Sequence, residues 1–298
     1  MSDDFGFLLL LLSNGIMIGL MYTLIALGFV LVYKATDAVN FAQGEFVMIA
    51  GLVVAGALDA LRAPLWAAIL IGLGTMVGFG FLLERVMLRK LIGRPVIAVV
   101  MATIGLASIL RGIGPSTLGA GTRTLPLPIP DEPFVLGPLF IPPIQLLGAA
   151  VSLIFLGGFG WFFLRSRNGI AMRAIADNQQ VALAMGINVE RYFALAWAMA
   201  GIVSALGGVV WGAMLGVDNQ LAVVGLKVFP VVILGGLDSV VGAVVGGIIV
   251  GVVENLAAGY LDPYVGGGTK DIAPYILMIV VLMIRPSGIF GRRLIERV

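Results

Sequence analysis

Apolar residues dominate the chain in long runs that short polar stretches separate. A transmembrane helix needs about 20 mainly apolar residues, and runs of that length recur from one end of the chain to the other. Because the runs are continuous and do not alternate with polar positions, they predict helices and not barrel strands. The pattern predicts nine spans, at residues 7–33, 38–59, 63–87, 95–113, 141–164, 191–215, 219–237, 239–260 and 271–286.

Composition and charge support an all-α, polytopic transmembrane bundle over residues 1–298. The chain is 60% hydrophobic and 11% charged, whereas soluble domains carry about 25% charged residues. The net charge of +2 is too small to indicate nucleic-acid binding. Most of the 18 lysine and arginine residues, including Arg292, Arg293 and Arg297, fall on one side if the N-terminus lies outside. Positive charge accumulates in the cytoplasm, so we expect the N-terminus outside and the C-terminus inside.

Two polar turns interrupt the apolar pattern at corresponding places. The first occupies residues 34–45, and the second occupies residues 216–227. Five spans separate the two turns, so they lie on opposite sides of the membrane. Interrupted hydrophobic segments in both halves are typical of inverted-repeat transporters, whose pathway lies at the repeat interface.

Asn40, Gln43 and Glu45 lie where an apolar span should begin. Polar side chains at membrane depth should face a cavity or another protein surface. The alternative is an ordinary helix start, in which Asn40 caps the helix and Glu45 favours its dipole. Spacing alone leaves both interpretations open.

Lys227 lies within an otherwise almost uncharged span. A lysine near mid-span costs about 2.5–3.5 kcal/mol on insertion scales, so it should have a partner or reach the surface. Glu254 in the next span is a candidate partner for an intramembrane ion pair, which could be purely structural. Pro230 should break the same segment and make the helix discontinuous.

Residues 165–191 form a polar island between long apolar runs. The periodicity of residues 171–185 predicts one short amphipathic helix, which Gly186 ends. A short helix joined to a span at an angle can fit a groove on a soluble partner. The alternative is an interfacial helix whose arginines touch lipid phosphates on the inner leaflet.

The longest predicted outer loop, residues 113–140, is rich in proline, which suits an extended or turn-rich segment. It could close over the spans or dock an external partner.

The chain lacks cysteine and histidine, which leaves few residue types for metal binding or nucleophilic catalysis. It also lacks the G-x-x-x-x-G-K-[ST] phosphate loop, so we expect neither a metal, nor an ATP site, nor enzymatic activity in this chain.

Three blocks of the chain resemble the LivH-type permeases, which are subunits of ATP-driven importers of branched-chain amino acids. Residues 22–51 (YTLIALGFVLVYKATDAVNFAQGEFVMIAG) resemble the opening of these permeases. Residues 167–208 resemble their cytoplasmic coupling segment, and residues 225–255 resemble their C-terminal signature. Together the blocks cover about a third of the chain, in matching order.

The resemblance implies a single permease domain in the bacterial inner membrane, with residues 165–190 as the cytoplasmic coupling segment. It implies four kinds of partner: a second, LivM-like permease, two ABC ATPase subunits that bind ATP and Mg²⁺, a periplasmic substrate-binding protein, and the lipid bilayer. The resemblance implies transport by alternating access. The residues expected at the ATPase contact are Arg173, Asp177, Asn178, Gln179 and Gly186, and those expected to line or support the pathway are Asn40, Gln43, Glu45, Asn219 and Lys227.

Other functions remain open at this point. Related permeases carry urea, short amides and other amino acids, and nothing in the sequence selects one substrate. An ion- or proton-coupled secondary transporter would also contain broken helices and lone charges, such as those of Lys227 and Glu254. A passive channel would conduct without ATP, and a structural subunit would leave the polar turns unexplained.

Overall fold

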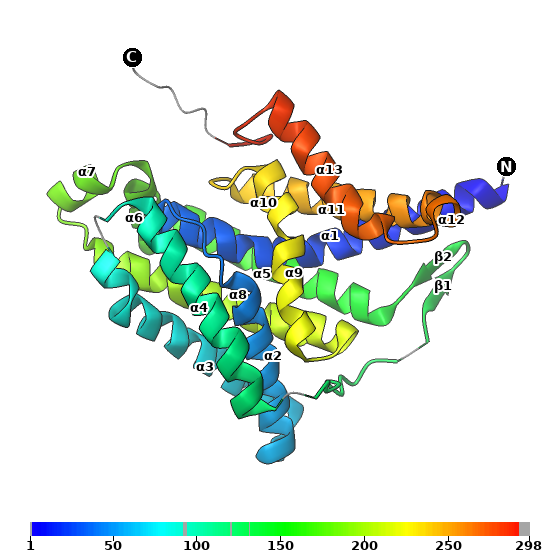
Figure 1. Ribbon diagram of the computed structural model, residues 1–298, viewed down its shortest axis with the longest axis horizontal. Coiled ribbons are helices and arrows are strands. Elements are labelled where there is room, and N and C mark those ends of the chain that lie inside the picture. Colours follow the sequence, from blue (N-terminus) through cyan, green and yellow to red (C-terminus); the bar gives the residue numbers. More distant parts are fainter. Residues whose placement is uncertain (1, 92–93, 120, 131, 292–298) are drawn as a thin grey trace. The chain divides into compact units, whose positions relative to one another are not determined.

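The computed structural model describes residues 2–91, 94–119, 121–130 and 132–291. Helices dominate it (Figure 1), and the basic residues Arg292, Arg293 and Arg297 lie outside the described part. In the first half the elements are α1 (Ser2–Thr36), α2 (Gln43–Ala60), α3 (Leu65–Val86), η1 (Leu88–Leu91), α4 (Val96–Leu118), β1 (Phe134–Leu136), β2 (Leu139–Ile141) and α5 (Pro143–Arg165). In the second half they are α6 (Arg167–Asp177), α7 (Gln179–Ala184), α8 (Val189–Leu215), η2 (Asn219–Ala222), α9 (Val223–Lys227), α10 (Phe229–Gly235), α11 (Val240–Tyr260), α12 (Asp262–Val265) and α13 (Thr269–Ile284).

Seven helices among the described residues are long and apolar enough to span a membrane, which confirms the predicted polytopic bundle. They are α1, α2, α3 continued through η1, α4, α5, α8 and α11. The predicted span 219–237 is broken into η2, α9 and α10, with Pro230 in the first turn of α10. The last predicted span corresponds to α13, which has 16 residues.

The prediction placed the end of the fourth span at residue 113, but α4 continues to Leu118. Pro115 lies within this last turn, and Thr117 bonds back to the Ile113 carbonyl at 2.8 Å. A proline near the end of a membrane helix is tolerated when serine and threonine side chains satisfy carbonyl groups there. Pro115 therefore does not end α4, and the helix is longer than the prolines of the loop predict.

Contacts divide the chain into two units, and each unit combines segments from both halves of the sequence. The first unit contains residues 1–26, 128–153 and 226–298, and the second contains residues 27–127 and 154–225. The divisions fall inside α1, α5 and α9, so these helices contribute residues to both units.

Helix α2 forms the centre of the second unit, where α3, α4, α8 and η2 pack around it. Phe46 of α2 is fully buried, and its ring contacts Phe79 of α3 at a centroid distance of 5.3 Å and Trp197 of α8 at 6.1 Å. Each aromatic pair contributes about 0.5–1.5 kcal/mol beyond the area that it buries. This aromatic core fixes α2 against the α3 and α8 helices.

Glycines allow helix backbones to touch within this second unit. A Cβ on Gly80 of α3 would lie 2.5 Å from the Trp197 carbonyl oxygen, and one on Gly201 of α8 would lie 2.3 Å from the Met76 carbonyl oxygen. Helix α2 meets α9 in the same way, because a Cβ on Gly225 would lie 2.3 Å from the Gly44 Cα. Small residues at such contacts are the usual route to close helix packing in membranes.

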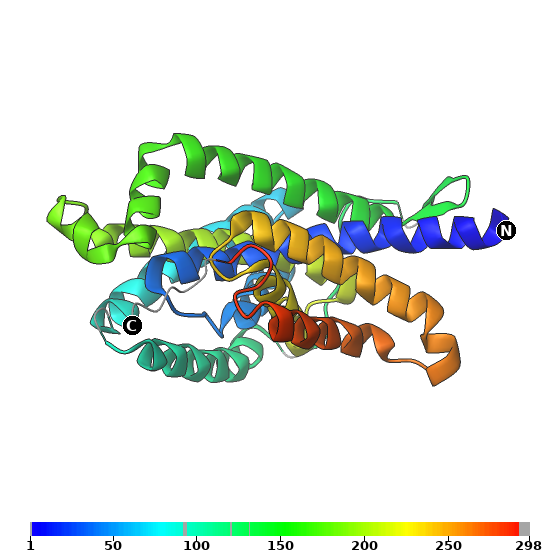
Figure 2. The same ribbon diagram turned by 90° about the horizontal axis from the view of Figure 1, so that it is seen from above.

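In the first unit, α11 runs antiparallel alongside the start of α1 (Figure 2). Gly15 of α1 lies against Gly251, and Gly19 lies against Gly247. The buried Tyr22 hydroxyl donates a 2.9 Å hydrogen bond to Glu254 Oε2 across the same pair of helices. Both side chains lean toward the N-terminus of their own helix, which brings them together in an antiparallel pair.

In each unit, the first helix of one half of the sequence packs through glycines on a helix of the other half. In the second unit α8, the first long helix of the second half, packs on α3 of the first half. In the first unit α1, the first helix of the first half, packs on α11 of the second half. The inverted repeat itself stays a prediction.

The predicted outer loop, residues 113–140, holds two ordered features. In the second unit, Arg123 and Val217 exchange backbone hydrogen bonds of 3.1 and 2.8 Å, and the Thr122 hydroxyl donates to Asp218 at 2.8 Å. In the first unit, β1 and β2 form an antiparallel hairpin around Gly137 and Pro138. The hairpin exposes the apolar side chains of Phe134, Val135, Leu136 and Phe140.

Replacing Gly44 with alanine should destabilise the crossing of α2 and α9. The new Cβ would lie 2.2 Å from the Ala222 carbonyl oxygen, so the two segments must separate. Overpacking of this kind costs about 1–3 kcal/mol, and we expect detergent-solubilised Gly44→Ala to melt at a lower temperature than wild type. Gly56→Ala in the same helix is the matched control, because its Cβ meets nothing within 4 Å. Equal melting temperatures for the two variants would contradict the crossing.

Candidate functional site

The polar turn between α1 and α2 is closed by its own side chains. Asn40 Oδ1 accepts a 3.1 Å hydrogen bond from the Ala42 N–H, and Asn40 Nδ2 donates to Gln43 Oε1 at 3.1 Å. Both side chains are fully buried in the second unit. Burial raises the pKa of the Asp37 carboxyl at the start of this turn. The predicted pathway residues Asn40 and Gln43 therefore lie together, bonded to each other.

Gln43 also joins the turn to α8. Its Nε2 donates to the Ser204 hydroxyl at 3.0 Å, and that hydroxyl donates to the Ala200 carbonyl at 2.8 Å. Gly28 of α1 makes room for the amide, because a Cβ there would lie 2.2 Å from Gln43 Nε2. The sequence did not single out Ser204, since a serine in an apolar helix looks like any small residue.

Two residues of α4 complete the site. The Thr103 hydroxyl accepts a 3.3 Å hydrogen bond from the Phe41 N–H and donates to the Val100 carbonyl at 2.9 Å. Glu45, which is almost fully buried, forms an ion pair with Arg111. A buried carboxylate is tolerated only with such a partner. We name the buried residues Asn40, Gln43, Glu45, Thr103 and Ser204, with Arg111, the polar junction.

The other two predicted pathway residues do not join the polar junction. Asn219 is exposed at the first position of η2 in the second unit. Lys227 ends α9, belongs to the first unit and forms an ion pair with Asp271 of α13.

The expected ion pair between Lys227 and Glu254 needs correction. Lys227 pairs with Asp271, and Glu254 accepts from Tyr22, while Glu254 Oε1 has no hydrogen-bond partner among the described residues. The Asp271 side chain is 65% exposed, whereas Glu254 is completely buried. A lysine loses less hydration by pairing with the exposed carboxylate, which explains the choice.

The polar island also departs from its prediction, because it contains two helices in place of one. Helix α6 ends at Asp177, and Asn178 adopts an extended backbone between α6 and α7. Asn178 Oδ1 then accepts a 3.0 Å hydrogen bond from the Val181 N–H and caps α7. Gly186, with φ of 81°, ends α7 in the left-handed conformation as expected. Asparagine in this position starts a new helix more favourably than it continues one.

Two of the polar residues expected at a partner contact are engaged within the second unit. Arg173 Nη2 donates to the Leu164 carbonyl at 3.3 Å, and its guanidinium lies 5.8 Å from the centre of the Phe163 ring. Gln179 Nε2 donates to the Ala35 carbonyl at 3.3 Å. These contacts fasten α6 and α7 to the ends of α5 and α1, and Asp177 is exposed beside them.

Three large apolar side chains on α7 and directly after it are exposed. Val181 and Leu183 are each 57% exposed, and Met185 is 77% exposed. Helices α6 and α7 lie beside the first residues of α8 (Figure 1), and Ala182 is buried toward the protein. We name Val181, Leu183 and Met185 the α7 patch.

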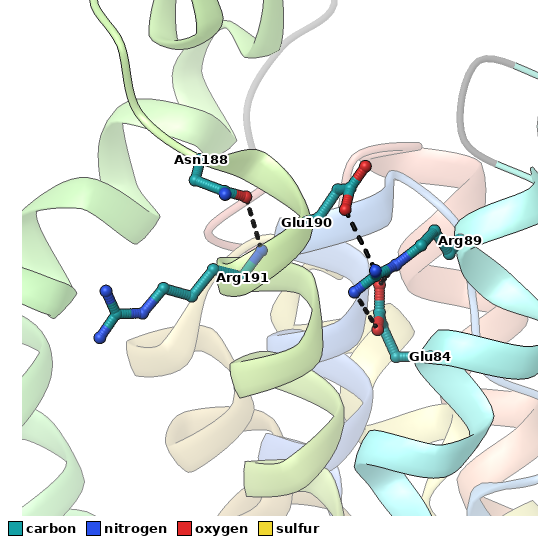
Figure 3. A network of polar contacts seen from close by, with 5 residues as sticks. All are labelled: Glu84, Arg89, Asn188, Glu190 and Arg191. Carbon is teal, nitrogen blue, oxygen red and sulfur yellow. Dashed lines mark hydrogen bonds and ion pairs between the residues drawn. The ribbon is translucent and has the colours of Figure 1, made fainter.

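A network of charges holds the end of the island (Figure 3). Asn188 Oδ1 accepts from the Arg191 N–H at 3.1 Å and caps α8. Arg89 forms two hydrogen bonds of 3.1 Å to the buried Glu84, and its Nη1 lies 3.3 Å from Glu190 Oε2. Sequence reasoning missed this network, although a glutamate at the end of an apolar span was a signal.

Among the described residues, no group of three or more aspartate or glutamate side chains is placed to hold a metal ion.

Comparisons with known proteins agree along nearly the whole chain. A family model described as "Branched-chain amino acid transport system / permease component" matches residues 11–282. The high-affinity branched-chain amino acid transport system permease protein BraD of Pseudomonas aeruginosa is 31% identical over 302 residues, which cover 96% of this chain and 97% of BraD. The corresponding protein LivH of Escherichia coli is 31% identical over 314 residues and is matched over 100% of both chains.

Replacing Ser204 with alanine should weaken the polar junction. The change removes the acceptor of Gln43 Nε2 in a fully buried place, and an unsatisfied buried donor costs about 1–3 kcal/mol. We expect Ser204→Ala to melt at a lower temperature than wild type in detergent. Ser108→Ala is the control, because that exposed serine bonds only to the Ile104 carbonyl of its own helix. A Ser204→Ala protein as stable as the control would argue against the junction.

Proposed function

Because the chain belongs to the family of branched-chain amino acid transport system permease components, we propose that it is the membrane permease of an ATP-driven importer of branched-chain amino acids. The chain is a multi-pass membrane protein with helices suited to span a bilayer. In this proposal it lies in the bacterial inner membrane, with its N-terminus outside and its C-terminus in the cytoplasm.

The observation that carries the proposal is the α7 patch. The surrounding island is polar, yet its short helix turns three apolar side chains to the outside while polar contacts fasten the island to α1 and α5. Exposed apolar groups of this kind mark contacts with a protein or with a membrane, and the proposal assigns them to a protein. An ATPase groove that receives a helix would use apolar anchors of this kind. Residues 165–190 then form the coupling segment, with Asp177 and Gly186 beside the contact and Arg173, Asn178 and Gln179 shaping it.

The partners follow from this arrangement. The chain has no phosphate-binding loop, so ATP and Mg²⁺ bind to two separate ABC ATPase subunits. A second, LivM-like permease completes the pore. A periplasmic binding protein delivers the substrate to the outer side, where the exposed hairpin β1–β2 offers a surface for it.

Alternating access fits the two interrupted segments. Asn40, Gln43 and Glu45 support the pathway by fixing the start of α2, and Gly44 of the same turn touches Gly225 of the second interrupted segment. A movement of one segment must therefore displace the other. Asn219 and Lys227 belong to that second segment and its end.

Reconstituted transport tests the proposal. Proteoliposomes would contain this chain, its candidate partner permease, the ATPases and the binding protein, and would receive labelled leucine, urea or a short amide. Uptake of leucine that needs both ATP and the binding protein is the expected result. Preference for urea or a short amide would move the substrate to the related class. Uptake that ignores ATP would overturn the proposal in favour of a secondary transporter or channel.

Replacing Met185 with aspartate should weaken ATPase binding. The change places a charge at the most exposed residue of the α7 patch, and loss of a buried apolar anchor at an interface costs about 1–3 kcal/mol or more. We expect less ATPase to co-purify with Met185→Asp than with wild type. Gln180→Asp adds the same charge to an exposed polar position of α7 and serves as the control. Equal recovery of ATPase with both variants would exclude the α7 patch as the contact.

A further inference from the structure

We infer that Arg89 is a positioning residue that locks the exit of the coupling segment to α3, so that force on the island reaches the α3–α8 pair. The inference rests on the proposed function, because it assigns a route within the same importer. It concerns Glu84, Arg89 and Glu190 (Figure 3), which no family motif in the sequence had singled out.

Arg89 bridges two carboxylates from different elements. It lies in η1, just after α3, and its Nε and Nη2 each bond to one oxygen of Glu84 at 3.1 Å. Its Nη1 reaches Glu190 Oε2 at 3.3 Å in the first turn of α8. The planar guanidinium suits this double use, because it presents several donors in a fixed fork. One side chain thereby joins α3, η1 and α8.

The ion pair between Glu84 and Arg89 is required for folding. The Glu84 side chain is only 2% exposed and lies in the last turns of α3, where the helix dipole disfavours negative charge. Without Arg89, a buried carboxylate would have no compensating charge at this place. The Arg89 guanidinium is therefore held in one position, from which it meets Glu190.

The ion pair between Glu190 and Arg89 is not required for folding, but it lies where it can couple the island to α3. Glu190 is about half exposed and is the last residue of the coupling segment. The Asn188 cap fixes the same turn of α8. Arg191, the next residue, points away from Glu190 and Arg89 in Figure 3. The ion pair between Arg89 and Glu190 thus connects the end of the island to a fixed charge on the α3 side.

Beyond this connection, α3 and α8 behave as one body. Gly80 and Gly201 allow their backbones to touch, and Phe46 of α2 packs against both helices through Phe79 and Trp197. A displacement of the first turn of α8 therefore moves α3 as well, and both act on α2. The ion pair of Arg89 with Glu190 lies at the end of this body that is nearest to the island. It prevents the first turn of α8 from moving without α3.

The test uses Glu190→Gln in the complete reconstituted importer, with labelled leucine as the probe. This variant cuts the connection and leaves the Glu84–Arg89 pair intact, so folding and ATPase recovery should equal wild type. We expect about two- to five-fold more ATP hydrolysed per leucine imported, which is the factor that an exposed ion pair can supply. Arg191→Gln is the matched control, because it also changes one charge at an exposed position next along the chain, and its ratio should equal wild type.

The outcomes separate the inference from the proposed function. A wild-type importer whose Glu190→Gln variant keeps the wild-type ratio would overturn the role of Arg89 and leave the proposed function standing. An equal rise in Arg191→Gln would also overturn it, because the effect would then be general to charge at this end. Leucine uptake by wild type that ignores ATP would overturn both.

A double-mutant cycle gives a second, independent measurement. Arg89→Lys keeps a positive charge beside the buried Glu84 but loses the guanidinium fork that also reaches Glu190, and Arg89→Lys and Glu190→Gln are made singly and together. If the two residues act as one connection, each single change should raise the ratio of ATP to leucine, and the double change should add nothing further. Additive effects of the two changes would overturn the inference.

Discussion

Close contact between helix backbones, at glycines, is the constraint on which both units depend. Gly44 touches Gly225 where the two interrupted segments cross, and Gly19 touches Gly247 where α1 meets α11. Lipid offers no hydrophobic force that would bring apolar helices together, so dense packing has to supply the attraction. Such contacts leave no space for a side chain, and they hold the helices at fixed positions. A polar group placed beside them can therefore find its partner reliably.

The polar junction depends on that precision. Except for Arg111, its side chains are buried among apolar helices, and they bond both to one another, as Gln43 does with Asn40 and Ser204, and to backbone groups, as Thr103 does. A hydrogen-bond network in such surroundings is favourable only when nearly every member is satisfied. The junction thereby fixes one arrangement of α1, α2, α4 and α8. The charge network around Arg89 does the same for α3 and α8 at the end of the island.

Apolar run length was enough to predict the seven long helices, because burial in lipid requires it, but it also predicted one span at 219–237 where the structure has η2, α9 and α10. The packing partners of the helices were not predictable, because the sequence around a glycine does not show which element lies against it. A Cβ on Gly80 would touch the backbone of α8, whereas one on Gly78, two residues earlier, would meet nothing within 4 Å. The partners of Arg89 were not predictable for a similar reason. Glu190 lies on α8, far along the sequence, and Glu84 lies five residues before Arg89 in α3, whereas Arg89 lies in the 3-10 helix η1. The break at Asn178 was visible in principle, since asparagine is a strong helix start.

The α7 patch has a consequence for the cell as well as for transport. Three large apolar side chains are exposed in the isolated chain, and exposed apolar surfaces promote aggregation. A subunit made in excess would therefore associate with the wrong proteins or be recognised by proteases that remove unassembled chains. If the α7 patch binds the ATPase as proposed, the same surface makes an unassembled copy short-lived and ties the abundance of this subunit to that of its partner.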